Sequence, residues 1–160
     1  MRKRRKPKDT ALWDQKDWKQ TGDELVTEIG RGMLCAVCGT PNGVCLHHLL
    51  PKSRFDRFRF RRENLLPLCP SHHKFSNELA AHAGNALAVQ RFSEWLALNH
   101  PLQDAWIRKH ECTKVVRLDW RKLYAAFVSD LELLKTKGLK FLLTRDDGLV
   151  TMGAEKGESG

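Results

Sequence analysis

Two short pairs of potential metal ligands constrain the fold of this chain more than any other feature. Cys35 and Cys38 are separated by two residues, and the same spacing recurs further along between Cys69 and His72. Three thiolates and one imidazole in this pattern are typical of a closed, tetrahedral Zn²⁺ site. The pattern therefore predicts a structural zinc site that joins two distant segments.

Two alternatives remain open for these cysteines. Cys45 could replace His72 as the fourth ligand, or the cysteines could be small buried residues without a metal. Disulfides are disfavoured because the five cysteines are an odd number and no secretory signal is expected: the basic start, MRKRRKPK, is not followed by a hydrophobic stretch. Without an apolar run long enough to cross a bilayer, we expect no membrane association and a cytoplasmic location.

The charge balance points to a polyanionic partner. Lys and Arg number 28 against 19 Asp and Glu, a formal net charge of +9. An excess of this size favours nucleic acid as the partner. A charged surface that only keeps the protein soluble would give the same balance, so the position of the cations must decide.

Hydrophobic periodicity predicts an α+β fold. In the first half we expect helix over residues 10–29, divided at Gly22, then strands over 44–50 and 58–61, with 63–67 as a loop. In the second half we expect a helix from near Ser71 up to Gly84, one over 85–99 stopped by Pro101, and one over 119–137 stopped by Gly138. The expected organisation is a basic arm with a helical segment, a small core, a helical extension and a flexible tail, at 1–30, 31–82, 83–144 and 145–160.

Two pairs of adjacent histidines accompany the cysteines. The run Cys-x2-Cys, then His47-His48-Leu-Leu-Pro, then Glu63-Asn64-Leu65, then Leu-Cys69-Pro-Ser-His72-His73, resembles the HNH endonucleases. The resemblance covers about residues 35 to 80 and implies a small ββα-metal core. In it, His48, Asn64 and His73 match the H, N and H that name the family.

The resemblance also implies roles for these residues. His47, His73 and Asn77 would hold one catalytic cation, with Asn77 one helical turn after His73, and His48 would be the general base. Asn64 would orient the loop and the His48 ring, although a plain turn residue is an equal reading of its position. The cation would be Mg²⁺ or Mn²⁺, with Ni²⁺ or Zn²⁺ as further options because imidazole ligands are softer than an all-oxygen shell.

A narrower set of motifs is similar to the phage NinG (Rap) recombination endonucleases. It consists of Cys-x2-Cys-Gly-Thr, the run Arg59 to Asn64, His73-Lys74 and Ser76-Asn77. That likeness implies action on branched DNA in a bacterial or phage-infected cell. The HNH resemblance as a whole implies DNA as the partner and leaves open whether it is duplex, nicked or branched, with RNA as an alternative. It leaves open whether the protein is a monomer or a homodimer.

Cations are concentrated between the two histidine motifs. We expect phosphate contacts from this region, through Lys52, Arg54, Arg57, Arg59, Arg61, Arg62 and, beyond it, Lys74. The interleaved phenylalanines are expected in the core, with Phe58 and Phe60 on one face of a strand.

The competing function is a non-catalytic zinc ribbon that binds nucleic acid or a protein. It would use the same Cys and His ligands and the same cations but would give no role to His47, His48 or Asn77. The remaining His82, His100, His110 and Cys112 lack motif spacing and are expected to be core or surface residues. The stripe Leu123, Phe127, Leu131 and Leu134 is expected to pack within the chain, with a dimer seam as the alternative.

Overall fold

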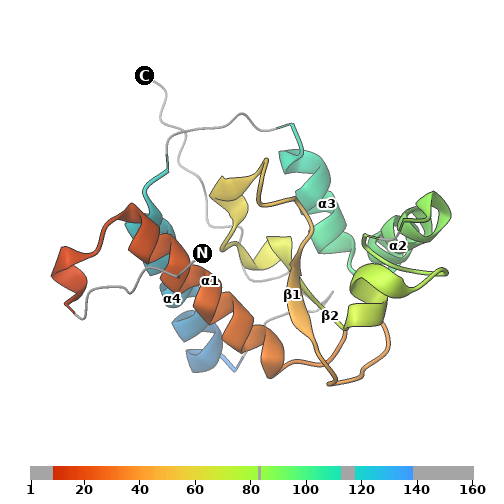
Figure 1. Cartoon of the computed structure of the whole chain (residues 1–160), viewed down its shortest axis with the longest axis horizontal. Helices are drawn as coiled ribbons and strands as arrows, with labels where there is room; N and C mark the ends of the chain where they lie inside the picture. Colours follow the sequence, from red (N-terminus) through yellow and green to blue (C-terminus); the bar gives the residue numbers. More distant parts are fainter. Residues whose placement is uncertain (1–8, 83, 113–117, 139–160) are drawn as a thin grey trace.

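A two-stranded antiparallel sheet lies at the centre of the molecule. The computed structural model describes residues 9–82, 84–112 and 118–138. Strand β1 (Cys45–His48) pairs with β2 (Leu65–Leu68), with Cys45 opposite Leu68 and His48 opposite Leu65. Helices surround this small sheet, so the architecture is α+β (Figure 1).

Four α-helices account for most of the regular structure, together with short turns of helix. The α-helices are α1 (Gln15–Arg31), α2 (Ala86–Asn99), α3 (Pro101–His110) and α4 (Trp120–Thr136). The 3₁₀ turns are η1 (Thr10–Leu12), η2 (Asp56–Phe58) and η3 (Arg62–Asn64), and η4 (Ser71–Phe75) is a single π-helical turn.

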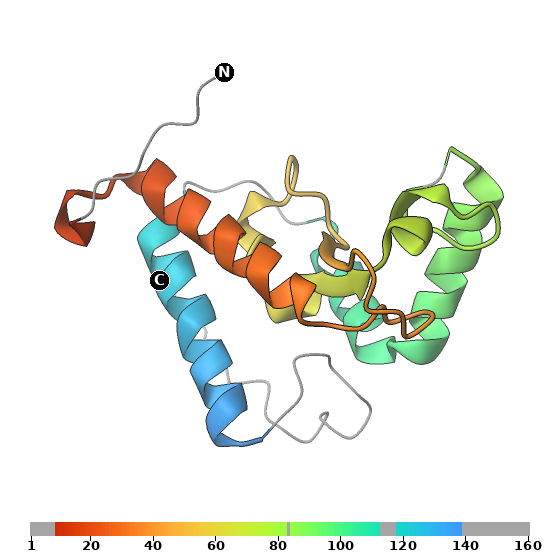
Figure 2. The same cartoon turned by 60° about the horizontal axis from the view of Figure 1, so that its bottom comes forward.

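The two faces of the sheet are covered by different helices. Leu46 and Leu65 point to one face, where they pack with residues of α1 and α4 such as Val26 and Phe127. Leu66 and Leu68 belong to the cluster on the other face, which α2 completes with Phe92 and Leu96. Figure 2 shows α1 and α4 together on one side of the strands and α2 on the other. Alternation along the strands produces this division.

Helices α2 and α4 confirm the expected ranges, and their ends follow ordinary capping rules. The side chains of Asn85 and Asp119 accept hydrogen bonds from the first backbone N–H groups of α2 and α4. Gly138 adopts the left-handed conformation, with φ of 61°, just after α4. Pro101 follows the end of α2 and is also the first residue of α3, a helix that was not predicted.

The expected division of the first helix at Gly22 is wrong, because α1 is continuous through it. A Cβ atom built on Gly22 would lie only 2.2 Å from Cζ of Phe60. The glycine therefore makes room for the Phe60 ring against the helix, and this packing outweighs the lower helix propensity of glycine.

The expected strand over 58–61 is also wrong. Residues 56–58 form η2, and the second strand is Leu65–Leu68, which falls partly in the expected loop. Phe58 and Phe60 are both buried, as expected, but in separate clusters: Phe58 with Phe55 and Leu50, and Phe60 with the α1–α4 residues. The alternating pattern of Phe58 and Phe60 therefore comes from contacts with two separate clusters and not from one face of a strand.

The helix expected from Ser71 to Gly84 is limited to the turn η4. Ser76 is extended, with φ of −70° and ψ of 131°, and its hydroxyl accepts hydrogen bonds from the backbone N–H groups of Glu78 and Leu79. A serine that bonds to the backbone in this way favours a turn over a helix. The chain therefore reverses after Phe75.

The predictions for the two ends of the chain are not tested by the structure. Residues 1–8 of the basic arm and the tail over 145–160 lie outside the described residues. Within the described ranges, no helix combines the length and apolar character needed to cross a bilayer.

The apolar stripe of α4 packs within the chain, as expected. Phe127 is buried, and Leu123 and Leu131 pack against the same cluster.

Candidate metal centres

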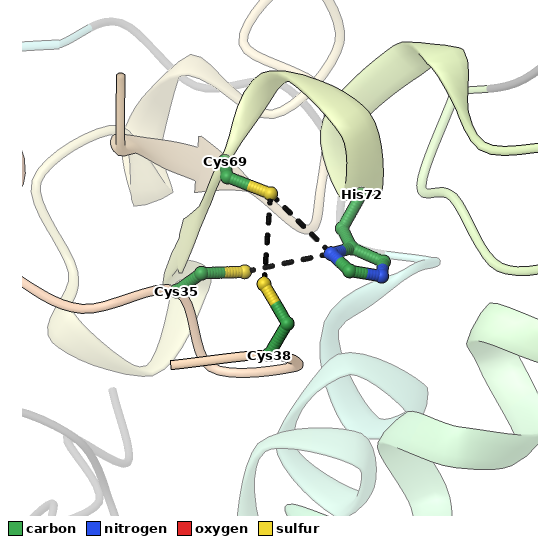
Figure 3. Close-up of side chains that lie close together, drawn as sticks. All are labelled: Cys35, Cys38, Cys69 and His72. Carbon is green, nitrogen blue, oxygen red and sulfur yellow. Dashed lines mark hydrogen bonds between the residues drawn. The ribbon is translucent and has the colours of Figure 1, made fainter. Parts of the chain in front are cut away.

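The first metal group consists of Cys35, Cys38, Cys69 and His72. The Sγ atom of Cys69 lies 3.3 Å from Nδ1 of His72 and 3.9 Å from Sγ of Cys38. Sγ of Cys35 lies 3.7 Å from the same nitrogen of His72. Tetrahedral zinc, with Zn–S bonds near 2.3 Å, requires ligand separations of about 3.5–3.8 Å. The four side chains converge on one centre and are positioned to bind a metal ion such as zinc (Figure 3).

The loop of this group is folded for thiolate binding. The N–H of Gly39 donates to the carbonyl of Cys35, and Gly39 has φ of 71°, a conformation that glycine adopts easily. Burial opposes ionisation of the Cys35 thiol, but hydrogen bonds from backbone N–H groups, first that of Cys69 and then that of Cys38, lower its pKa to about 6. A thiol with a low pKa is suited to bind metal as a thiolate.

The alternative in which Cys45 replaces His72 is not what the structure shows. His72 belongs to the first group, whereas Sγ of Cys45 lies 3.6 Å from Nδ1 of His73, the next residue along the chain. Burial raises the pKa of the Cys45 thiol, and the charge of Lys74 opposes this only in part. Cys45 is therefore a protonated neighbour of the second metal group.

That second group consists of His47, His73 and His82. One nitrogen from each ring lies within 4.8 Å of the other two. The ring centroids are 5.0 Å apart for His47 and His73, 4.6 Å for His47 and His82, and 5.5 Å for His73 and His82. Three imidazoles at these separations suit one divalent cation that keeps at least one coordination position open.

His82 reaches this group because the chain turns back onto η4. The N–H of His82 donates to the carbonyl of His73 at 3.0 Å, and the N–H of Ala81 donates to the carbonyl of His72 at the same distance. The sequence predicted His82 to be a core or surface residue without a site role. The structure corrects this, because the backbone pairing brings His82 to His73, although no motif spacing marks it. The turn signal at Ser76 was the one available indication.

Asn77 does not have the position that its predicted role requires. The prediction needed a helix that carries Asn77 one turn beyond His73, but η4 ends at Phe75 and Asn77 is exposed in the following turn. Its backbone carbonyl accepts a hydrogen bond from the amide of Asn85. The premise for Asn77 as a ligand therefore fails, and His82 provides the third imidazole.

The environment favours the neutral form of His47 and His73. Burial lowers the pKa of His47 well below its ordinary value, and the neighbouring His82 and His73 lower it further. The pKa of His73 is lowered by burial and then by His82 and Lys74. Neutral imidazole is the form that binds metal, so the lowered pKa values of His47 and His73 favour cation binding by these two rings.

His48 faces away from the second metal group. His47 lies opposite Leu66 on the α2 face of the sheet, whereas His48 lies opposite Leu65 on the α1 face. Nε2 of His48 lies 2.8 Å from the carbonyl oxygen of Arg59. Burial, and then the charges of Lys52 and Arg59, lower the pKa of His48 to about 4, although the hydrogen bond to the Arg59 carbonyl opposes this shift. The ring is consequently neutral at pH 7.

Asn64 connects the two ends of the loop between the strands. Its side-chain oxygen accepts from the N–H of Leu50 at 2.6 Å, and its amide donates to the carbonyls of Phe58 at 3.0 Å and Leu50 at 3.3 Å. Asn64 is fully buried, so these bonds satisfy an amide that would otherwise be costly to bury. Its bonds orient the loop, while the Arg59 carbonyl contacts the His48 ring.

The side chains expected to bind phosphate differ in their exposure to solvent. Lys52, Arg54, Arg61 and Lys74 are exposed, and Arg57 and Arg62 are half-buried. Arg59 departs from the expectation, because its guanidinium binds the carboxylates of Asp23 and Asp56 and is only 12% exposed.

Comparisons of the chain with protein-family models, with curated proteins and with solved structures found no match.

Proposed function

We propose that this protein is a metal-dependent endonuclease of the HNH type, which hydrolyses phosphodiester bonds in DNA. One observation carries the proposal: a three-imidazole group lies directly beside a closed Cys3His group and uses the next residue of the chain, His73 after His72. A zinc ribbon needs only the closed group. The open group gives the fold a position for a cation with free coordination sites.

Each side chain has a defined task in this proposal. The imidazoles of His47, His73 and His82 would hold the cation, which when bound stabilises negative charge that develops on the phosphate. His48 accepts a proton from water: its ring is neutral at pH 7, and its partial exposure leaves it accessible. His47 and His48 are adjacent at the end of β1 but face opposite sides of the sheet, so the proposal requires the phosphodiester to lie against the end of the strand, within reach of both faces.

The ligand set favours certain cations. Three imidazoles bind Mn²⁺, Ni²⁺ or Zn²⁺ more readily than Mg²⁺, which prefers oxygen ligands. The exposed Lys52, Arg54, Arg61 and Lys74 supply contacts to the phosphates on either side of the cleaved bond.

The test is cleavage by His48→Ala. Protein with its structural zinc retained is incubated with Mn²⁺ or Mg²⁺ and with supercoiled plasmid, linear duplex and a four-way junction in parallel. We expect the unmodified protein to cleave at least one substrate, and His48→Ala to lose cleavage while it keeps its fold, zinc content and DNA affinity.

His110→Ala is the matched control, since Nδ1 of His110 also lies 2.7 Å from a backbone carbonyl, that of Trp106, in the separate helix α3. This variant should cleave normally. Full activity of His48→Ala would exclude His48 as the base. Zinc and DNA binding without cleavage under any metal would instead favour the non-catalytic zinc ribbon.

A further inference from the structure

The hydrogen bond of His48 fixes which ring nitrogen can accept a proton. A backbone carbonyl only accepts, so Nε2 of His48 carries the hydrogen and donates it to Arg59. Nδ1 is then the nitrogen without a proton. The orientation and tautomer of His48 therefore depend on the position of one carbonyl group in the loop between the strands.

The side chain of Arg59 holds that carbonyl in place. Nε and Nη2 of Arg59 donate to the two carboxylate oxygens of Asp23 at 2.6 and 2.8 Å, and Nη1 donates to Asp56 at 2.6 Å. A two-point contact between guanidinium and carboxylate is directional as well as strong. The largely buried Arg59 side chain is thus held by three hydrogen bonds, which restrict the position of its own backbone.

Helix α1 is the rigid support for this arrangement. Asp23 lies in α1, and Lys19, one turn earlier, donates to the second oxygen of Asp56 at 2.6 Å. The Phe60 ring packs against Gly22 of the same helix. Polar and apolar contacts therefore attach both sides of Arg59 to α1.

We infer that Asp23 and Arg59 are positioning residues for His48, through which α1 sets the orientation and tautomer of the ring. The inference rests on the proposed function for its catalytic consequence. Helix α1 lies before residues 35–80, the segment that carries the HNH motifs, so this support is an addition to that segment. It also explains why Arg59, in the middle of a basic run, faces carboxylates.

The experiment combines NMR with kinetics on Asp23→Asn, which keeps the shape of the side chain and removes its charge. Long-range ¹H–¹⁵N spectra of the zinc-containing protein report the tautomer of His48. We expect the unmodified protein to show the Nε2–H form and Asp23→Asn to show a mixture. We also expect kcat for DNA cleavage to fall roughly 10- to 100-fold, with KM unchanged within about twofold.

Two further variants complete the design. Asp104→Asn is the control, because Asp104 pairs with Arg108 on α3 through similar contacts at 2.8 and 3.4 Å, and it should leave the spectrum and kcat unchanged. Arg59→Lys, which keeps the charge but loses the two-point contact, should reproduce the effect of Asp23→Asn and replaces that variant if it does not fold.

The outcomes separate the two proposals. An unchanged His48 spectrum in folded Asp23→Asn and Arg59→Lys overturns the positioning role, even if kcat falls. Absence of cleavage by the unmodified protein with every cation counts against the proposed nuclease, whereas the NMR comparison still decides whether Asp23 and Arg59 orient His48.

Discussion

At the scale of single residues, His82 and Asn77 differ most from their predicted roles: His82 belongs to the second metal group and Asn77 does not. Asn77 was expected as a ligand from its spacing, and His82 reaches the group through the reversal after Phe75. Both residues are exposed, so substitution of either leaves the core intact.

We predict that His82→Ala weakens binding of Mn²⁺ or Ni²⁺ by more than about tenfold, because one of three ligands is lost. Asn77→Ala should leave the affinity unchanged within about twofold. Titration calorimetry on protein with its Cys3His zinc retained measures both. The reverse order of effects would restore Asn77 as the ligand and remove His82.

The residues of the closed site could be predicted from the sequence and those of the open site only in part. Cys35, Cys38, Cys69 and His72 form two pairs with local spacing, and local spacing survives any arrangement of the chain between the pairs. His82 depends on backbone hydrogen bonds that close a turn between residues 73 and 82, and no motif spacing in the sequence marks that turn.

At the scale of elements, the packing of α1 on the loop between the strands depends on Gly22. We predict that Gly22→Ala lowers the free energy of unfolding by about 1–3 kcal/mol. The new Cβ would overlap the Phe60 ring, which is itself confined by the rings of Trp120 and Phe127 at 5.9 Å. This cost exceeds the gain in helix propensity, which is about 1 kcal/mol.

Chemical denaturation followed by circular dichroism measures the change. Gly32→Ala is the control, since a Cβ there lies 3.7 Å from its nearest neighbour, the carbonyl oxygen of Ile29, in an ordinary contact. If Gly22→Ala matched or exceeded the stability of the unmodified protein, the close packing of Phe60 on α1 would be wrong.

Elements with their own local signals were predicted well, and elements defined by partners were not. Helices α2 and α4 have capping side chains and long apolar periodicity. Strand β2 (Leu65–Leu68) is buried on both faces and contains Pro67, so it has neither alternation nor strand propensity. Only pairing with β1 identifies it as a strand.

At the scale of the whole molecule, the Cys3His group joins the loop over 35–38 to the turn that follows β2. The surrounding cluster contains Cys35 and Cys69 together with Phe92 of α2. Metal binding and packing of the α2 face are therefore parts of one structure, and metal contributes directly to folding in such sites.

We predict that Cys38→Ala loses bound zinc and the cooperative unfolding transition of this half of the molecule. Cys112→Ala is the control because both thiols are exposed and Cys112 lies outside the two metal groups found among the described residues. Elemental analysis gives the zinc content and a thermal melt gives cooperativity. A soluble, folded and zinc-loaded Cys38→Ala protein would contradict the role of this thiolate.

Segments that are far apart in the sequence share one core, which the order of the motifs does not indicate. Helices α1 and α4, from opposite ends of the described chain, pack together on one face of the sheet (Figure 1). The expected boundaries near residues 30 and 83 thus divide segments that share a core. Sequence order alone cannot indicate that the first and last helices are neighbours.

The adjacency of His72 and His73 couples the two metal groups mechanically. Loss of zinc would free the backbone that holds His73, and with it the segment that brings His82 to the same centre. We therefore expect a chelator strong enough to extract zinc to abolish cation binding at both groups, whereas a mild one that strips only the three-imidazole group should leave the fold intact and its effect reversible when the cation is added back.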